Sequence, residues 1–404
     1  MAKIKIGIIK EGKTPPDKRV PLTPFQCKKL ISQYPNLYLV VQKSSIRCFK
    51  DKEYADLGVK LVEDVSDCDV LFGIKEVVKS ELLDFKTYFY FSHTIKEQSY
   101  NRVLLQTMIK KGISMVDYEA LTDTNGRRIL GFGRYAGVVG CYNGFLAYGK
   151  RTKRYSLKAA HLCSNRLELE TELQKIDLPA VKIIVSGNGR VGQGALEIIR
   201  QLQIREVSKE EFISKTFDEA VYVHLDFYDY NERIDGSTFS NKDFISNPEW
   251  FQSCFMNYAS CGDIFIAGHY YGKGSPYLFT REDAKSPDFK IRTIADISCD
   301  IDGPVASTIR SSTIADPIYG YNPRNESEDD FDKDDVITVM AVDNLPCELP
   351  KDASEDFGDK LIKHILPALL IDDPDNIISR ATICENGDLT NNYGYLRSFV
   401  NNND

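Results

Sequence analysis

A glycine-rich turn between a buried strand and a helix constrains the fold of this chain most strongly. Val181–Ser186 is a short apolar, β-rich run, and Gln193–Leu202 has helical spacing. Between them stands Gly187-Asn188-Gly189-Arg190-Val191-Gly192. In such a turn the first glycine permits the bend, the second lets the backbone approach a pyrophosphate, and the third allows close helix–strand packing. A packing turn without ligand can look the same, but this position after a strand and before a helix favours dinucleotide binding.

Strand and helix patterns alternate on both sides of this turn. Lys3–Ile9 is β-rich, and a helix is predicted from Pro24, with Thr23 as its N-cap. We expect Asn322–Asp335, with seven acidic and two basic residues, to be a solvated loop. This alternation predicts an α/β fold of parallel strands with crossover helices. The further predicted strands are Leu37–Val41, Asp69–Ile74, Tyr88–Phe91, Ile113–Val116, Asp263–Ala267, Ile291–Ile297 and Val336–Val342, and the further helices are Glu97–Lys111 and Phe357–Leu370.

Composition narrows the class of protein. The 404 residues are 42% hydrophobic and 27% charged, which is typical of a soluble globular chain of more than one domain. A net charge of −8 argues against a nucleic-acid partner, and no apolar run is long enough to span a membrane. The ten cysteines form no CxxC pair, so we expect reduced thiols, a cytoplasmic location and no metal site. The sequence leaves the oligomeric state open.

Ionisable residues follow the carboxyl ends of several strands in the first part of the chain. Lys75 and Glu76 come after Ile74, His93 comes after Phe91, and Glu119 comes soon after Val116. In an open parallel sheet that edge faces the ligand. A histidine and a lysine whose pKa is lowered by nearby charges can exchange protons near neutral pH. Fixed positive charge for a polycarboxylate substrate would come from Lys13, Arg19 and Lys96.

The position about twenty residues beyond the glycine turn indicates the cofactor. A carboxylate there would bind the 2′-hydroxyl of NAD. Ser208 and Lys209 stand at that place in this chain. Because a hydroxyl and a cation suit a 2′-phosphate, the sequence favours NADP(H), with NAD(H) as the alternative.

Five short stretches carry a family resemblance that extends over nearly the whole chain. They are Phe91–Lys96, Asp117–Glu119, Phe132–Gly137, Ala295–Asp300 and Asp343–Pro346. With these stretches, the sequence resembles the lysine-ketoglutarate reductase and lysine-forming saccharopine dehydrogenase branch of the alanine dehydrogenase/transhydrogenase N-terminal superfamily. The resemblance implies two Rossmann-like doubly wound domains with an interdomain cleft. Residues 1–137 with 346–404 would form the substrate domain, and residues 138–345 the dinucleotide-binding domain.

The same resemblance assigns roles to single residues. It implies that Lys75 and His93 are the acid–base pair and that Glu119 tunes them. Substrate-binding roles are implied for Lys13, Arg19 and Lys96, while Asp296 and Asn344 would line the nicotinamide side. Apart from the resemblance, Glu76 beside Lys75 would be an acidic neighbour for the amine. One departure concerns the amine, because Ala306 and Arg310 stand where this branch usually carries glutamates.

These observations predict an NAD(P)-dependent oxidoreductase acting on CH–NH donors. The expected reaction is saccharopine-type condensation of L-lysine with 2-oxoglutarate and reduction of the product, or its reverse. The partners would therefore be small molecules, an amino acid and a 2-oxo dicarboxylate. Two alternatives remain at this point: an alanine dehydrogenase-like enzyme that uses ammonia, and a dinucleotide-binding homologue without turnover.

Overall fold

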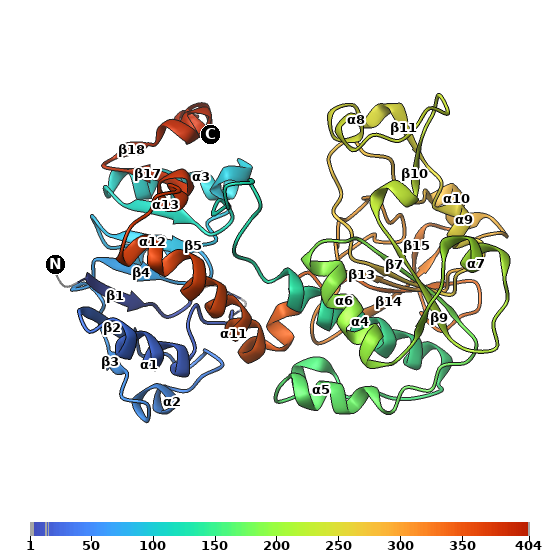
Figure 1. The fold of residues 1–404 in the computed structure, drawn as a ribbon, viewed down its shortest axis with the longest axis horizontal. Helices are drawn as coiled ribbons and strands as arrows, with labels where there is room; N and C mark the ends of the chain where they lie inside the picture. Colours follow the sequence, from blue (N-terminus) through green and yellow to red (C-terminus); the bar gives the residue numbers. More distant parts are fainter. Residues whose placement is uncertain (1–3, 13, 15, 403–404) are drawn as a thin grey trace. The chain divides into compact units, whose positions relative to one another are not determined.

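The chain forms two compact units, each with its own hydrophobic core. The computed structural model describes residues 4–12, 14 and 16–402. Unit 1 comprises residues 1–132 and 350–404, and unit 2 comprises residues 133–349 (Figure 1). The sequence placed the first boundary after residue 137, but α4 (Gly133–Thr152) is one continuous helix that belongs to unit 2. The chain therefore crosses from one unit to the other at the start of this helix.

Unit 1 is built on a mainly parallel sheet, which has eight strands within the described residues. The strands lie in the order β18-β17-β6-β5-β4-β1-β2-β3, and β17 pairs antiparallel with β6. The order β3-β2-β1-β4-β5-β6 is that of a Rossmann-like doubly wound sheet. The strands are β1 (Ile4–Ile8), β2 (Leu37–Gln42), β3 (Lys60–Val62), β4 (Val70–Phe72), β5 (Thr87–Tyr90), β6 (Ser114–Asp117), β17 (Thr382–Glu385) and β18 (Asp388–Leu389).

Helices from both ends of the sequence complete unit 1. The predicted N-cap of α1 is confirmed, because Thr23 accepts a hydrogen bond from the backbone of Gln26 and Pro24 opens the helix. The predicted C-terminal helix is α11 continued by a π-helical turn and α12, and α11 packs against α1. The helices are α1 (Pro24–Gln33), α2 (Asp51–Ala55), α3 (Ser99–Lys110), α11 (Pro350–Lys360), α12 (Leu366–Leu370), α13 (Ile377–Ala381) and α14 (Arg397–Asn401).

Unit 2 also contains a doubly wound sheet, in which the glycine turn follows the first strand, but its strand order differs from that of unit 1. Its sheet is ordered β15-β14-β16-β13-β12-β7-β9-β8, with β14 and β15 antiparallel. The two α/β units confirm the predicted fold class. The strands are β7 (Lys182–Ser186), β8 (Arg205–Glu206), β9 (Val221–Leu225), β12 (Ile264–Ala267), β13 (Thr293–Asp296), β14 (Ile318–Asn322), β15 (Ser327–Asp329) and β16 (Ile337–Met340). The helices besides α4 are α5 (Arg166–Leu173), α6 (Arg190–Gln201), α7 (Lys209–Ser214), α8 (Asn241–Ser246), α9 (Met256–Ala259) and α10 (Arg281–Lys285).

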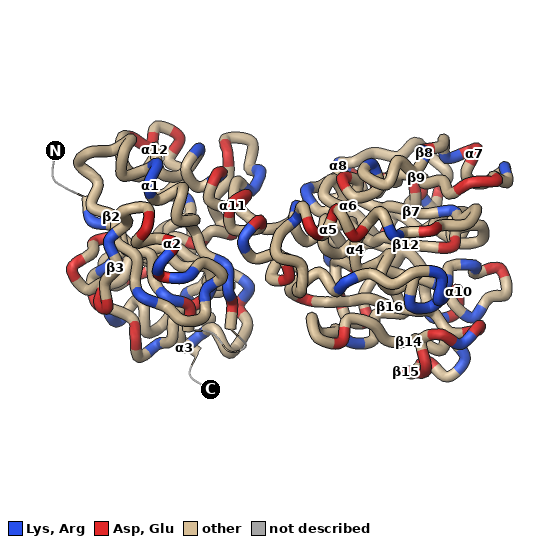
Figure 2. The backbone as a smooth tube through the Cα atoms, turned by 90° about the horizontal axis from the view of Figure 1, so that it is seen from below, with Lys and Arg blue, Asp and Glu red and all other residues tan. Residues whose placement is uncertain are grey.

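Two segments of unit 2 differ from the sequence prediction. The acidic stretch that was expected to be a loop contains the edge strand β15, where Asp329 accepts hydrogen bonds from Lys333 and Asn322. Opposite charges therefore neutralise part of this stretch. A two-stranded arm of β10 (Asn231–Arg233) and β11 (Phe251–Ser253) also projects beyond β9 (Figure 1). Basic and acidic residues are interspersed in both units (Figure 2).

Close backbone contact fixes α4 against α6. A Cβ atom on Gly137 would lie 1.9 Å from the carbonyl oxygen of Val191, and one on Gly194 would lie 2.1 Å from that of Arg134. The backbones of the two helices meet at these glycines, because any side chain there would overlap a carbonyl group. This contact places the N-terminus of α6, which directly follows the glycine turn.

A buried carboxyl group lies at the end of unit 2, just before the chain returns to unit 1. Glu348 is 2% exposed, and its Oε1 accepts a hydrogen bond from Asn143 Nδ2 at 2.8 Å. Its Oε2 lies 3.9 Å from His161 Nδ1. Burial raises the pKa of Glu348 to about 7.

We predict that Glu348 makes folding stability depend on pH. Between pH 4.5, the ordinary pKa of a glutamate, and about pH 7, Glu348 keeps its proton in the folded state and loses it in the unfolded state. The free energy of unfolding therefore falls as pH rises through this window. The neutral variant Glu348→Gln should therefore gain up to ~3 kcal/mol over wild type between pH 5 and pH 8. Calorimetric unfolding at several pH values measures the difference. The same substitution at exposed Glu249 is the control, and equal pH dependence in all three proteins would contradict the prediction.

Candidate active site

The carboxyl ends of four neighbouring strands of unit 1 form the candidate site. β4 pairs in parallel with both β1 and β5, and β5 pairs in parallel with β6. The loops after these strands therefore begin at one edge of the sheet. The backbone of Phe91 still donates to the carbonyl of Ile74 at 3.0 Å, so the segments that lead to Lys75 and His93 run side by side.

Glu119 is the electrostatic centre of this edge. Its Oε2 lies 3.4 Å from His93 Nδ1, and its Oε1 lies 3.2 Å from Lys96 Nζ and 2.6 Å from Arg128 Nη2. Burial opposes ionisation of Glu119, but the contact with His93 and the charges of Arg128 and Lys96 outweigh it and hold its pKa well below the usual range. An ionised carboxylate beside an imidazole can accept the ring N–H and hold the ring in place, which suits a group that exchanges protons with a substrate.

The structure therefore brings three of the predicted residues together and adds Arg128. His93 and Lys96 contact Glu119 directly, as expected of neighbours at one site. Arg128 was missed because it lies on a short hairpin, where Thr122 bridges to it, and not at a strand end. A basic residue in a turn gives no sequence signal of its own.

Glu11 is a second site residue that the sequence analysis missed. It follows β1, and its Oε1 accepts a hydrogen bond from the Ile74 amide at 2.6 Å while its Oε2 accepts one from the Lys75 amide at 3.0 Å. Burial raises the pKa of Glu11 to about 8, although these two backbone donors and Arg19 stabilise its charge. Glu11 thus fixes the backbone of Lys75 and can itself hold a proton near neutral pH.

The remaining predicted substrate residues have different surroundings. The side chain of Arg19 is 4% exposed and bonds Asp17 in bidentate fashion, at 3.0 Å from Nε and 2.6 Å from Nη2. Its guanidinium also lies 4.1 Å from the centre of the Phe132 ring. A substrate carboxylate would therefore have to share Arg19 with Asp17. Glu76 is half-buried beside Lys75, and Lys13 lies outside the described residues.

Aromatic side chains form the wall behind this edge. The Phe132 and Phe357 rings are stacked with centroids 4.7 Å apart, and Tyr118 meets Phe357 edge-on at 5.1 Å. Phe91 contacts this group and stacks against His93 at 6.3 Å. Such a wall lowers the local dielectric constant, which strengthens the ionic contacts of Glu119.

The glycine turn of unit 2 has the geometry expected of a dinucleotide cradle. Gly187 has φ +95°, and a Cβ on it would lie 2.4 Å from the carbonyl oxygen of Gly268. A Cβ on Gly192 would meet the Gly187 carbonyl at 1.8 Å, whereas one on Gly189 would meet nothing within 4 Å. The space at Gly189 and the helix N-terminus at Arg190 suit a pyrophosphate. Asn188 accepts a hydrogen bond from Gln193 and Val191 packs at Gly137, so both support the turn.

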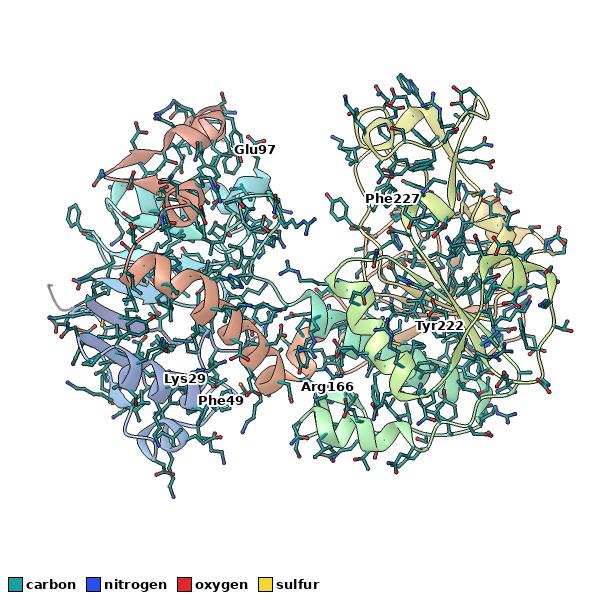
Figure 3. All side chains as sticks on the ribbon, viewed as in Figure 1. Lys29, Phe49, Glu97, Arg166, Tyr222 and Phe227 are labelled. Atoms are coloured by element: carbon teal, nitrogen blue, oxygen red, sulfur yellow. The ribbon has the colours of Figure 1, made fainter. Side chains whose placement is uncertain are left out.

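The structure corrects the position that was assigned to the ribose. The strand next to β7 is β9, and the short β8 lies one strand farther out. Asp226 directly follows β9, where many dinucleotide-binding sheets carry an acidic residue, and its side chain caps the turn that begins at Phe227 (Figure 3 labels Tyr222 within β9 and Phe227 just beyond it). Ser208 instead caps α7, and Lys209 forms an ion pair with Asp229. The short strand and helix inserted before β9 moved the acidic residue beyond the expected spacing.

The other predicted residues of unit 2 are also placed. Asp296 is fully buried and accepts hydrogen bonds from Ser298, Cys299 and Thr308, so it shapes the loop after β13. Asn344 is half-buried before the turn Leu345–Glu348.

The two positions that depart from the family pattern have structural partners. Ala306 is buried in the core of unit 2. Arg310 bonds Glu328 through both Nε and Nη2 at 2.7 Å. The charge of Arg310 is thus compensated within unit 2.

Among the residues that the structure describes, no helix is long and apolar enough to cross a membrane. The same residues hold no cluster of three or more histidine, cysteine or acidic side chains that could bind a metal ion.

Comparison with known proteins connects these features to a family. Residues 7–139 match the family described as alanine dehydrogenase/PNT, N-terminal domain. The chain is 29% identical over 436 residues to mitochondrial alpha-aminoadipic semialdehyde synthase of Mus musculus, covering 94% of this chain and 46% of that protein. It is 25% identical over 390 residues to saccharopine dehydrogenase (NAD(+), L-lysine-forming) of Yarrowia lipolytica, covering 90% and 92%. The chain thus spans about half the length of the semialdehyde synthases.

A solved structure shares the whole fold. An L-alanine dehydrogenase superposes with a TM-score of 0.64 at 16% identity, covering 98% of this chain and 99% of the other. This likeness confirms the Rossmann-like architecture of both units. The resemblance inferred from the sequence is likewise confirmed: residues 7–139 match the alanine dehydrogenase/PNT N-terminal domain, and the chain is similar in sequence to saccharopine dehydrogenases and alpha-aminoadipic semialdehyde synthases.

Proposed function

We propose that this protein is an NAD-dependent oxidoreductase of saccharopine type. It would join L-lysine to 2-oxoglutarate with reduction of the imine, or oxidise saccharopine in the reverse direction. The observation that carries the proposal is the contact of His93 with the ionised carboxylate of Glu119. The segment that leads to His93 runs beside the segment that leads to Lys75. The named reaction of the Yarrowia relative, which matches over nearly its full length, supports the same chemistry.

The residues of unit 1 supply the proton transfers that this reaction needs. The ε-amine of lysine must lose a proton before it attacks the keto carbon of 2-oxoglutarate, and the former keto oxygen must gain protons to leave as water. We assign these exchanges to Lys75 and His93, with Glu119 favouring the protonated ring. Glu11 holds the backbone of Lys75 in place. Lys96 and Arg128 supply positive charge for substrate carboxylates in addition to their contacts with Glu119.

The residues of unit 2 fit a nicotinamide dinucleotide, which when bound would supply or accept the hydride. The open space at Gly189 and the N-terminus of α6 would hold the pyrophosphate. Asp226 would accept hydrogen bonds from the hydroxyls of the adenosine ribose, and its negative charge would repel a 2′-phosphate. The earlier preference for NADP(H) rested on Ser208 and Lys209, whose side chains are engaged elsewhere. We therefore propose NAD(H).

Lysine is the proposed amine. Arg310 stands where the family usually carries a glutamate, and its cation would repel the ammonium group of a lysine substrate. Its bidentate bond to Glu328 supports the view that this charge does not act on the substrate. Glu76 remains the acidic side chain that we assign to the amine.

We predict that Lys75→Met combined with His93→Gln lowers turnover with lysine and 2-oxoglutarate by about 10³-fold or more, because each acid–base group contributes ~10²–10⁴-fold. Binding of the dinucleotide, measured by calorimetry, should stay within about twofold, because the glycine turn lies in the other unit. Cofactor oxidation followed by absorbance measures turnover.

The matched control is Lys79→Met with His364→Gln, which makes the same changes at exposed residues of unit 1. More than a tenth of wild-type turnover in the first double variant would refute the assignment. A panel of lysine, ornithine, glutamate and ammonium identifies the amine. Preference for ammonium would indicate an alanine dehydrogenase-like enzyme, and dinucleotide binding without turnover of any pair would indicate a non-catalytic homologue.

We also predict that wild type prefers NADH and that Asp226→Ser lowers the ratio of kcat/KM for NADH to that for NADPH by about tenfold or more, because removing a carboxylate relieves its repulsion of the 2′-phosphate. The comparison variant is Lys209→Ala, which should leave the ratio nearly unchanged. A large effect of Lys209→Ala with none of Asp226→Ser would restore the ribose position to the end of β8.

A further inference from the structure

Asp117 ends β6 and is completely buried, yet no step of the proposed reaction uses it. Its Oδ1 accepts a hydrogen bond from the backbone amide of Glu119 at 2.7 Å. Its Oδ2 accepts bonds from the backbone amide of Ser92 at 3.1 Å and from the Ser92 hydroxyl at 2.5 Å. One side chain thus bonds the residue before His93 on one loop and Glu119 itself on the next.

The loop around His93 needs such support. His93 has φ +56°, in the left-handed region that residues with a side chain rarely adopt. Besides the bond of Ser92 to Asp117, the hydroxyls of Ser92 and Thr94 lie 2.8 Å apart, and Asn101 donates to the carbonyl of His93 at 3.3 Å. A strained backbone of this kind persists only where its surroundings over-determine it.

We propose that Asp117 is a positioning residue that sets the contact between His93 and Glu119, an inference that rests on the proposed function for its catalytic consequence. It acts through these two residues and touches no reacting atom. The 3.4 Å separation of His93 Nδ1 from Glu119 Oε2 joins two different loops, and Asp117 bonds the backbone of both. Loss of either bond would let the loops move independently and weaken that contact.

The hydrogen bonds make asparagine a sharp probe. Both backbone groups that reach Asp117 are donors, so both carboxylate oxygens must accept. The amide of Asp117→Asn has nearly the same shape but only one accepting oxygen. One of the two loops must therefore lose its bond, while the volume of the buried side chain stays the same.

Burial raises the pKa of Asp117, and the negative charge of Glu119 raises it further. The hydrogen bonds from Ser92 and from the Glu119 amide lower it. The charge of His93 also lowers it. The carboxyl therefore depends on its donors to remain an acceptor at both oxygens.

The test compares Asp117→Asn with wild type in the full chain. We expect kcat to fall about 10–100-fold, the size of effect that small misplacement of a reacting group produces. Because His93 is assigned as the proton donor, a weaker contact with Glu119 should shift the alkaline limb of the kcat pH profile to lower pH. Dinucleotide affinity should stay within about twofold. A purely structural role would lower thermal stability and the active fraction but leave the pH profile of the remaining enzyme unchanged, and that result would overturn the proposal.

A double-mutant cycle tests whether Asp117 acts through the His93–Glu119 contact. If Asp117 acts through the His93–Glu119 contact, Asp117→Asn should add little to the loss caused by Glu119→Gln, whereas multiplicative losses would refute the proposal. Ser92→Ala keeps both backbone bonds to Asp117 but removes the Ser92 hydroxyl, which bonds Asp117 and Thr94. It should give a smaller loss in the same direction, which keeps the proposal testable if Asp117→Asn fails to fold. The matched control is Asp373→Asn, because Asp373 also accepts backbone amides with both oxygens, at Ile377 and Ile378.

A readout without turnover separates this proposal from the proposed function. The chain has five histidines, so ring signals can be followed by NMR, and His93→Gln assigns the signal of His93. In Asp117→Asn the titration of this ring should move to lower pH. An unchanged titration overturns the positioning role, whatever the substrates prove to be. A shifted titration in a protein that turns over none of the tested pairs supports the positioning role and refutes the proposed function.

Discussion

Parallel pairing of β4 with β1 and β5, and of β5 with β6, decides where the chemistry of unit 1 can occur. Parallel strands end at the same edge, so residues as far apart in the sequence as Glu11 and Lys75 meet there. Glu11 reaches the amide of Lys75 from β1, and Asp117 reaches Ser92 from β6. These hydrogen bonds continue the sheet beyond its last ladder bonds. The ionisable side chains therefore project from a braced edge rather than from loose loops.

The carboxyl groups at this edge differ because their neighbours differ. Glu119 is surrounded by His93, Lys96 and Arg128, which outweigh its burial and keep it ionised. Glu11 is more deeply buried, and the hydrogen bonds it accepts from the backbone of Ile74 and Lys75 do not outweigh that burial, so its pKa rises to about 8. Environments that push the pKa values of two carboxyl groups apart let one remain charged while the other carries a proton. That separation suits a reaction in which protons are both removed and returned.

Local patterns predicted much of the fold and part of the site. The N-cap Thr23 and the turn at Gly187 follow from residue types at fixed spacing, and both were found where expected. α4 was missed because it is buried on nearly every side and so lacks an amphipathic period. Asp226 was missed because the short strand β8 and a helix precede β9, which only the sheet order reveals. Buried acids such as Glu11 give no sequence signal, since their role depends on which backbone amides the tertiary fold brings to them.

Each unit has one place in its sheet where the strand order reverses, and different residues stand there in the two units. In a doubly wound sheet, a crevice opens where the strand order reverses. In unit 1 that point lies between β1 and β4, and the carboxyl group of Glu11 fills it by bonding the backbone at Lys75. In unit 2 it lies between β7 and β12, where Gly187 approaches Gly268 so closely that no side chain fits. One fold thus places a buried carboxyl group at this point in unit 1 and bare backbone at the same point in unit 2.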